Sequence, residues 1–259
     1  NGAGLTMATL DALSHYGGKP RTFLDLSGAT DPEKVAEAVR INPLLAQGVE
    51  LADVRKPLPR HDRHIQMLSL PHMLGTTLDS LPAPASYLSA DPAEVARWAD
   101  DLSGAGLKVG IAWQGNPAGN VDRGRSFPLR HFGALKAARP DIRLISLQKG
   151  HGEEQIADAG FEVECLEGRN SFPGTAAMMM HLDLVITSDT SIAHLAGALG
   201  RPVWLALKRY PDWRWMLERT DSPWYPATRL FRQTSDGDWN TVFNEMAAAL
   251  AAGEGPDVS

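Results

Sequence analysis

The sequence has little of what several protein classes require. Its 259 residues contain one cysteine, Cys165, which excludes an intrachain disulfide and a multi-cysteine metal site. The longest apolar stretches, 178–186 and 246–252, are too short or too interrupted to span a bilayer. The N-terminus carries no basic-plus-apolar signal, and the chain opens on Asn1. We therefore expect a fragment of a soluble, cytoplasmic protein with no membrane span.

Charge and missing motifs narrow the function. The net charge of −6 and a pI near 5.7 argue against a general nucleic-acid partner. The chain has no GxGxxG after a predicted strand, no P-loop lysine pattern, no HExxH and no GxSxG. A ligand that carries phosphate would have to be bound without these motifs, which leaves nucleotide sugars as a candidate class.

The pattern after residue 105 alternates between strands and helices. Short apolar segments bounded by Gly, Pro or Asp predict six strands, at 107–113, 142–148, 161–166, 183–188, 202–207 and 228–233. Helical patterns occupy 153–159, 190–199 and 239–250. This alternation predicts an α/β fold, a Rossmann-like parallel sheet flanked by helices. Upstream, Asp91 and Pro92 predict the start of a helix that Gly104 ends.

Tryptophan is distributed unevenly. All seven tryptophans follow residue 97, although a length of 259 residues suggests one and a half to two domains at about 150 residues each. Residues 55–90 are rich in proline and indicate a connector, and residues 1–40 show helical patterns at 5–16 and 32–39. The chain is therefore best treated in parts.

Ligands of open parallel sheets bind beyond the carboxyl ends of the strands, and three predicted loops there carry unusual residues. The first offers glycine for close backbone approach and arginine for phosphate. The second has a lysine at a helix start, where the helix dipole disfavours a cation, and a bound anion that contacts both the lysine and the helix would explain this misfit. The third places hydroxyl and amide groups at a helix N-terminus, a natural anion site. The candidate residues are Gly115, Asn116, Arg125 and Ser126 in the first loop, Gln148 and Lys149 in the second, and Asp189, Thr190, Ser191 and His194 in the third.

Each loop has a plainer interpretation. The first could be a solvated surface loop and Lys149 a solvated charge, while Asp189 or Thr190 could simply cap a helix and His194 could be a core histidine. Residues 119–149 hold seven Lys/Arg against two Asp/Glu, which favours a diphosphate over a neutral metabolite. Trp213, within RYPDWR at 209–214, could wall a base, or could pack in the core with Trp215.

Longer segments carry a resemblance. They read PLPRHDRHIQMLSLPHMLGTTLDSLP, VGIAWQGNP, DRGRSFPL, ISLQKG, LDLVITSDTSIAHLAGALGRPVW and PDWRWMLERTDSPWYPATRLFRQ. With them, residues 42–250 resemble the glycosyltransferase part of bacterial tetratricopeptide-linked glycosyltransferases, relatives of the heptosyltransferases with the two-domain GT-B fold. The resemblance implies the C-terminal half of that fold, a UDP- or ADP-sugar as donor substrate, a protein or glycan acceptor, no cofactor and no metal ion.

The resemblance also assigns residues. Asp189, Thr190 and Ser191 match the family's DT(S/G) turn at the phosphate-binding helix, and His194 matches its following histidine. Arg125 takes the place of a basic residue that contacts the diphosphate, and Gly115, Asn116 and Lys149 fall in ligand-facing loops. The family's catalytic base belongs to an N-terminal domain of which only 42–90 has a match here, so the catalytic residue is unknown.

Residues 1–41 resemble another family. The text NGAGLTMATLDALSHYGGKPRTFLDLSGATDPEKVAEAVRI is similar to part of the succinyl- or malate-CoA ligase β subunit. The resulting division is a ligase-like fragment at 1–41, a remnant of the first GT-B domain with its connector at 42–104, a nucleotide-sugar-binding domain at 105–250 and a flexible tail at 251–259. Three functions follow: a donor-binding glycosyltransferase domain, a non-catalytic nucleotide-binding fragment, or a fragment of an ATP-dependent CoA ligase β subunit.

Overall fold

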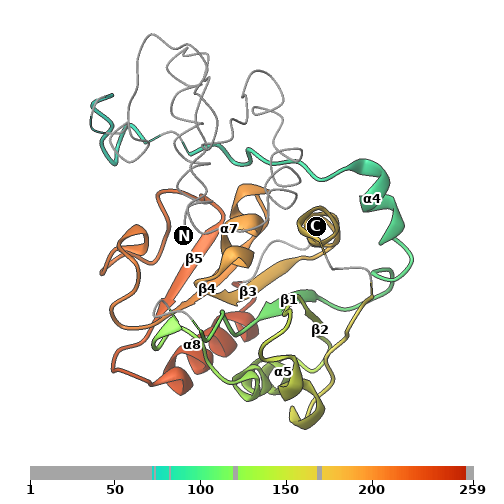
Figure 1. Cartoon of the computed structure of the whole chain (residues 1–259). Coiled ribbons are helices and arrows are strands. Elements are labelled where there is room, and N and C mark those ends of the chain that lie inside the picture. Colours follow the sequence, from blue (N-terminus) through green and yellow to red (C-terminus); the bar gives the residue numbers. More distant parts are fainter. Residues whose placement is uncertain (1–71, 73, 82, 119–121, 168–170, 255–259) are drawn as a thin grey trace.

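The computed structural model describes residues 72, 74–81, 83–118, 122–167 and 171–254. Its centre is a parallel sheet with the strand order β2-β1-β3-β4-β5 (Figure 1). The ligase-like segment 1–41, with its expected helices, lies outside the described residues. The strands are β1 (Lys108–Ala112), β2 (Arg143–Ser146), β3 (Leu184–Ser188), β4 (Val203–Leu207) and β5 (Thr228–Arg232).

The central strands are apolar throughout because both of their faces are covered. Every residue of β3 and β4 is buried. Successive side chains of β3 enter different cores, with Leu184 and Ile186 on one face and Val185 on the other. A strand buried on both faces has no polar side, so its sequence is a continuous hydrophobic run.

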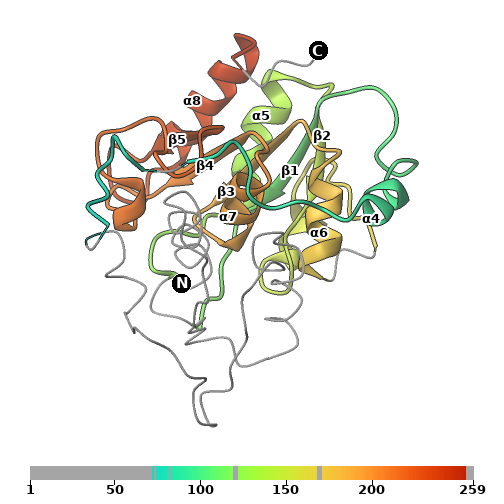
Figure 2. The same cartoon turned by 90° about the horizontal axis from the view of Figure 1, so that it is seen from above.

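Helices cover both faces of the sheet and complete a three-layer α/β arrangement (Figures 1 and 2). One face packs against α4, α6 and α7, and the other against α5 and α8. The predicted fold class is therefore confirmed. The helices are α4 (Pro92–Arg97), α5 (Gly133–Ala138), α6 (Phe172–Met179), α7 (Ser191–Ala198) and α8 (Trp239–Ala251), and the 3-10 helices are η4 (Leu129–Phe132), η5 (Glu153–Asp158) and η6 (Trp213–Trp215).

The predicted start of α4 is confirmed. The Asp91 side chain accepts a hydrogen bond from the Ala93 N–H, and Pro92 occupies the first helical position. The helix ends at Arg97 and is followed by turns through Leu102. It is therefore shorter than expected, because the sequence predicted that it would end at Gly104. Trp98 and Leu102 are nevertheless buried in the core beneath α6 and α7.

The predicted strand at 161–166 is wrong, and the helix predicted at 153–159 is confirmed only as a 3-10 helix. Residues 161–166 form no strand: Glu164 makes a single parallel bridge to Ile145, while Glu162 and Cys165 are exposed and water can satisfy the remaining backbone groups. Residues 153–158 form a 3-10 helix, preceded by Gly152 at φ 97°. The pattern also gave no sign of α6, because residues 174–179 are all buried and a helix without a polar face has no amphipathic period.

No helix in the described part of the chain is long and apolar enough to cross a membrane.

Helix α7 approaches its neighbours closely at Gly197. A Cβ atom added there would lie 2.5 Å from Cγ and 2.6 Å from Cδ1 of Tyr225, a buried ring that cannot easily retreat. Gly133, at the start of α5, offers a contrast, because its added Cβ would meet Phe161 at an ordinary 3.4 Å and its backbone is helical.

We predict opposite effects for alanine at these two glycines. Gly197→Ala should lower the free energy of unfolding by about 1–3 kcal/mol through overpacking. Gly133→Ala should leave it unchanged or raise it by up to about 1 kcal/mol, since alanine is the better helix former. Urea unfolding of both variants measures this, and equal effects would contradict the packing described for α7.

Candidate functional site

The sheet changes its direction of winding between β1 and β3. From β1 the chain moves outward to β2, and it then crosses back so that β3, β4 and β5 extend the other side of the sheet. The loops at the carboxyl ends of two such strands diverge and leave a crevice where ligands of open α/β sheets bind. Because Ala112 pairs with Thr187, residues 113–116 and 188–191 leave the sheet side by side.

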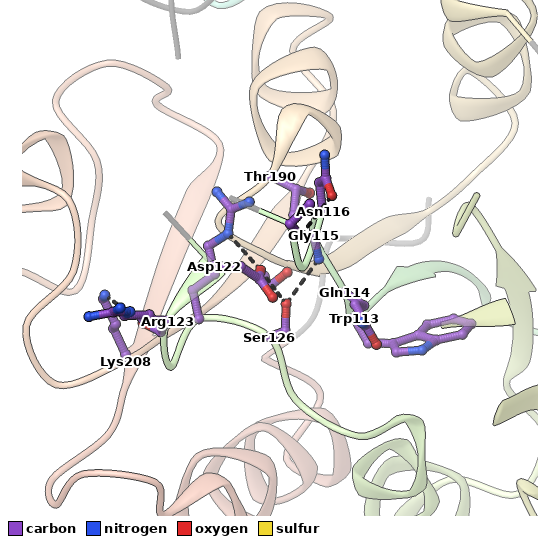
Figure 3. A network of polar contacts seen from close by, with 12 residues as sticks. Trp113, Gln114, Gly115, Asn116, Asp122, Arg123, Ser126, Thr190 and Lys208 are labelled. Atoms are coloured by element: carbon purple, nitrogen blue, oxygen red, sulfur yellow. Dashed lines mark hydrogen bonds and ion pairs between the residues drawn. The ribbon is translucent and has the colours of Figure 1, made fainter. Parts of the chain in front are cut away.

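The loop after β1 is held by a small polar network (Figure 3). The Gly115 N–H donates to Ser126 Oγ at 2.9 Å, and the Ser126 hydroxyl donates to Asp122 Oδ1 at 2.6 Å. Arg125 Nε lies 3.2 Å from the same carboxylate oxygen. A Cβ added to Gly115 would lie 2.3 Å from Arg125 Nη2, so only glycine lets this guanidinium lie against the loop backbone.

Further contacts shape the rim of this loop. Asn116 is exposed, and its Oδ1 accepts the Ala118 N–H at 3.0 Å in a local turn. Lys208, directly after β4, donates from Nζ to the Arg123 carbonyl at 2.9 Å (Figure 3). The loops that follow β1 and β4 are therefore tied together on either side of the end of β3.

Gln148 ties the second loop to the first. Its Oε1 accepts the N–H groups of Trp113 and Gln114 at 2.9 and 3.0 Å, and its Nε2 donates to the carbonyls of Gln114 and His151 at 2.8 Å each. The side chain is buried, and these four bonds use both of its donors and both acceptor positions. The described contacts of Gln148 thus position the loops, and direct ligand contact stays a prediction.

The second loop satisfies its own amide groups. The Glu153 carboxylate accepts the Gly150 N–H, and the Glu154 carboxylate accepts the Gly152 N–H, both at 2.8 Å. Protein carboxylates thus occupy the place where an external anion was expected. Lys149 is exposed at this loop, and its contact with a ligand stays a prediction.

The third loop leaves a helix end open. Thr190 is the N-cap residue of α7, with extended backbone, but its side chain makes no capping hydrogen bond. Its hydroxyl lies 3.3 Å from that of Thr187, and Ser191 is exposed as the first helical residue. Simple side-chain capping, the plainer alternative, is absent from α7. The start of this eight-residue helix, with its amide groups and positive dipole end, lies beside the loop that follows β1, where Figure 3 shows Thr190 near Gly115 and Asn116.

A largely buried acid and a largely buried base lie beside this helix end, with 15% of the Asp189 side chain and 17% of the His194 side chain exposed. His194 Nε2 is 3.8 Å from Asp189 Oδ1, and the imidazole stacks on Trp215 at 5.4 Å. Burial raises the pKa of Asp189, and burial, followed by the charge of Arg214, lowers the pKa of His194 to about 4. At neutral pH the imidazole is therefore neutral, and its contact with Asp189 is not a salt bridge.

Two arginines contribute positive charge here. Arg125 and Arg214 each lower the pKa of Asp189, against the larger effect of burial. Arg214 belongs to η6, where its Nε lies 3.4 Å from Asp212 Oδ1. The sequence pattern indicates a role for the segment 209–214 only through its tryptophan. Its position just after a strand carboxyl end was the signal that could have identified Arg214.

The two tryptophans of η6 have different environments. Trp215 is 1% exposed and belongs to the core, whereas Trp213 is 59% exposed and contacts Trp224 edge to face. Core packing is therefore correct for Trp215, and stacking against a base remains open for Trp213. Within the described ranges, no group of three or more His, Cys, Asp or Glu side chains is placed to bind a metal ion.

The fold and the site together define a Rossmann-like α/β domain with an uncapped helix N-terminus at its switch point. Comparison with known proteins narrows this class. Residues 128–207 match the family described as "Glycosyltransferase family 9 (heptosyltransferase)". The crystal structure of the glycosyl transferase family 9 from Veillonella parvula DSM 2008 has a similar fold, with a TM-score of 0.53 and 14% identity over 77% of this chain and 62% of that one.

Two relatives match different shares of the sequence. The chain is 33% identical to Protein FlbA of Caulobacter vibrioides in an alignment of 186 positions that covers 68% of this chain and 31% of FlbA. It is 61% identical over 41 residues to the succinate–CoA ligase [ADP-forming] subunit beta of Desulfurococcus amylolyticus, 16% of this chain and 11% of that subunit. The matches therefore span about a third of FlbA and about a tenth of the ligase subunit.

The lowered pKa of His194 predicts a loss of stability in acid. Between the unfolded value of 6.5 and the folded value of about 4, only the unfolded chain gains the proton. The contribution of neutral His194 to the free energy of unfolding is therefore complete above pH 6.5. It is lost as the pH falls toward about 4, and the total loss is about 3 kcal/mol. Protonation of Asp189, whose pKa is raised, acts in the opposite direction.

Urea unfolding of the wild type and of His194→Gln, between about pH 7 and pH 4.5, isolates the histidine contribution. The wild type should lose stability more steeply than the variant, while His151→Gln, at an exposed histidine, should follow the wild type. Parallel curves for wild type and His194→Gln would show that His194 is not a buried neutral base.

Proposed function

We propose that this domain binds the nucleotide diphosphate of a UDP- or ADP-sugar at the carboxyl edge of β1 and β3. The observation that carries the proposal is the uncapped start of α7 at the switch point, with Arg125 and Arg214 close by. Helix amides and guanidinium groups are the protein groups that suit a diphosphate best. The similarity to family 9 glycosyltransferases supports a sugar on that diphosphate.

The same arrangement suits the chemistry of a leaving diphosphate. When the bond between the anomeric carbon and the diphosphate oxygen breaks, negative charge grows on that oxygen. Fixed amide dipoles and arginine charges, already in place, stabilise this charge without reorganisation. We therefore propose metal-independent transfer, in which Arg125 and Arg214 neutralise the charge that a divalent cation neutralises elsewhere.

The transfer we propose inverts the sugar configuration. A protein or glycan hydroxyl attacks the anomeric carbon from the face opposite the diphosphate, one bond forms as the other breaks, and a general base takes the hydroxyl proton. The base is not assigned to any residue of this chain. The domain would thus be the donor-binding part of a cytoplasmic, tetratricopeptide-linked glycosyltransferase, in line with the resemblance of residues 42–250.

Calorimetry with ADP and with UDP tests the binding step. We expect saturable binding of at least one of them, equal in EDTA and in Mg²⁺. Arg125→Ala should weaken it about 10- to 100-fold, the usual effect of losing a charged hydrogen bond. Arg139→Ala is the charge-matched control, because Arg139 precedes β2 at the opposite edge and pairs with exposed Asp141. Absence of binding, or equal loss in both variants, would refute the proposal.

A donor-hydrolysis and transfer assay separates the enzyme from a non-catalytic binding domain. Release of sugar from an ADP- or UDP-sugar, abolished in Asp189→Ala, would support the transferase function. Tight nucleotide binding without release would favour the binding domain. A stable complex with a CoA-ligase α subunit would favour the ligase fragment, whose matching segment lies outside the described residues.

A further inference from the structure

Tyr225 is a buried residue that none of the preceding functions uses. It is 4% exposed and lies between η6 and β5, with its ring packed against Gly197 of α7. Its backbone N–H donates to Ser222 Oγ at 3.3 Å, and its carbonyl accepts the Thr228 N–H at 3.0 Å. The ring is thus held from both sides, with its hydroxyl directed at His194.

The hydroxyl of Tyr225 stands in a chain of polar groups. It lies 3.0 Å from His194 Nδ1 and 3.4 Å from the Tyr87 hydroxyl, which donates to it. The Tyr225 oxygen accepts a hydrogen bond from Tyr87, and the Tyr225 hydroxyl is within hydrogen-bond distance of Nδ1. A neutral imidazole that accepts at Nδ1 carries its proton at Nε2.

The contact on the opposite side of the imidazole also favours a proton at Nε2. Nε2 lies 3.8 Å from Asp189 Oδ1. An unprotonated Nε2 would turn a lone pair toward a carboxylate, whereas an N–H at this position is attracted to it. The contacts on both sides of the ring thus favour the Nε2–H tautomer.

Asp189 needs such donors because of where it lies. A carboxylate directly before α7 repels a diphosphate bound at the same helix end. His194 Nε2 lies 3.8 Å from Asp189 Oδ1, and the indole N–H of Trp215, which makes no hydrogen bond of standard geometry, acts on Asp189 by lowering its pKa against the larger effect of burial. These two neutral donors reduce the charge presented to the ligand and restrain the carboxylate.

We propose that Tyr225 is a positioning residue of the candidate site: it fixes His194 as the Nε2–H tautomer and, through it, orients Asp189 at the start of α7. The tautomer is a property of the protein alone, and the effect on ligand rests on the proposed function. The first hydroxyl in this series of polar groups belongs to Tyr87, which precedes the first strand of the sheet. The N–H groups of Tyr87 and Leu88 both donate to the Ala198 carbonyl at the end of α7 and hold this segment in place. The segment that leads into the domain thus contributes a hydroxyl to the site.

Histidine NMR on the full chain tests the tautomer directly. With ¹⁵N-labelled histidine, the signals missing from His194→Gln identify His194. The wild type should show a protonated Nε2 and an unprotonated Nδ1 at neutral pH. In Tyr225→Phe, which keeps the ring packing, the His194 signals should shift toward a mixture of tautomers. Tyr210→Phe, at a 61% exposed tyrosine, should leave them unchanged.

Nucleotide binding gives the second measurement, with ADP and UDP as probes. Tyr225→Phe should weaken binding about 3- to 10-fold, as expected for one lost hydrogen bond, and Tyr87→Phe should weaken it less. His194→Gln, whose amide can reach the Nε2 position, should retain more affinity than His194→Asn, whose amide reaches only the Nδ1 position. A merely structural histidine would show no such order.

The two measurements separate the two hypotheses. A wild type with its proton on Nδ1, or a Tyr225→Phe variant with unchanged His194 signals, overturns the role of Tyr225 whatever the ligand. A wild type that shows the Nε2–H tautomer but binds neither nucleotide refutes the proposed function and leaves the tautomer assignment standing. Unchanged affinity in Tyr225→Phe, with altered tautomer, overturns the positioning role.

Discussion

The reversal of winding between β1 and β3 is the constraint on which the site depends. Because all the strands run parallel, their carboxyl ends lie at the same edge of the sheet. The loops that follow β1 and β3 diverge there, because the chain winds in opposite directions from these two strands. The register then brings the Gly115 loop beside the start of α7. Residues as distant in sequence as Arg125, Asp189 and Arg214 come together there because of strand order, without any shared motif.

Burial and charge compete at this place. Desolvation raises the pKa of Asp189 and lowers that of His194, while two arginines act to keep the aspartate ionised. Asp189 is therefore accompanied by a neutral imidazole, an indole and two nearby arginines. A buried ion pair in its place would carry a large desolvation cost. The two arginines place positive charge beside the start of α7, although each also lies close to an aspartate and the chain as a whole carries a charge of −6.

Much of the fold could be predicted from sequence because buried parallel strands have a simple signature. The apolar runs that became β1, β3 and β4 and the turn at Asp189–Ser191 were identified on physical grounds. Helix α6 was not predicted because it is buried on all sides. The strand predicted at 161–166 is wrong because an apolar segment beside an outer strand can make a single bridge without forming a strand. Roles that depend on tertiary contact were beyond reach: the four hydrogen bonds of Gln148, the guanidinium against Gly115 and the hydroxyl of Tyr225.

The central claim is that the open N-terminus of α7 receives a nucleotide diphosphate. Amide NMR during an ADP titration tests it most directly, because amide groups that bind phosphate shift strongly. We expect the largest changes at Ser191, Ile192 and Gly115, with little change at Gly150 and Gly152, whose N–H groups already bind carboxylates. The largest changes in the second loop, or at the opposite edge of the sheet, would contradict the account.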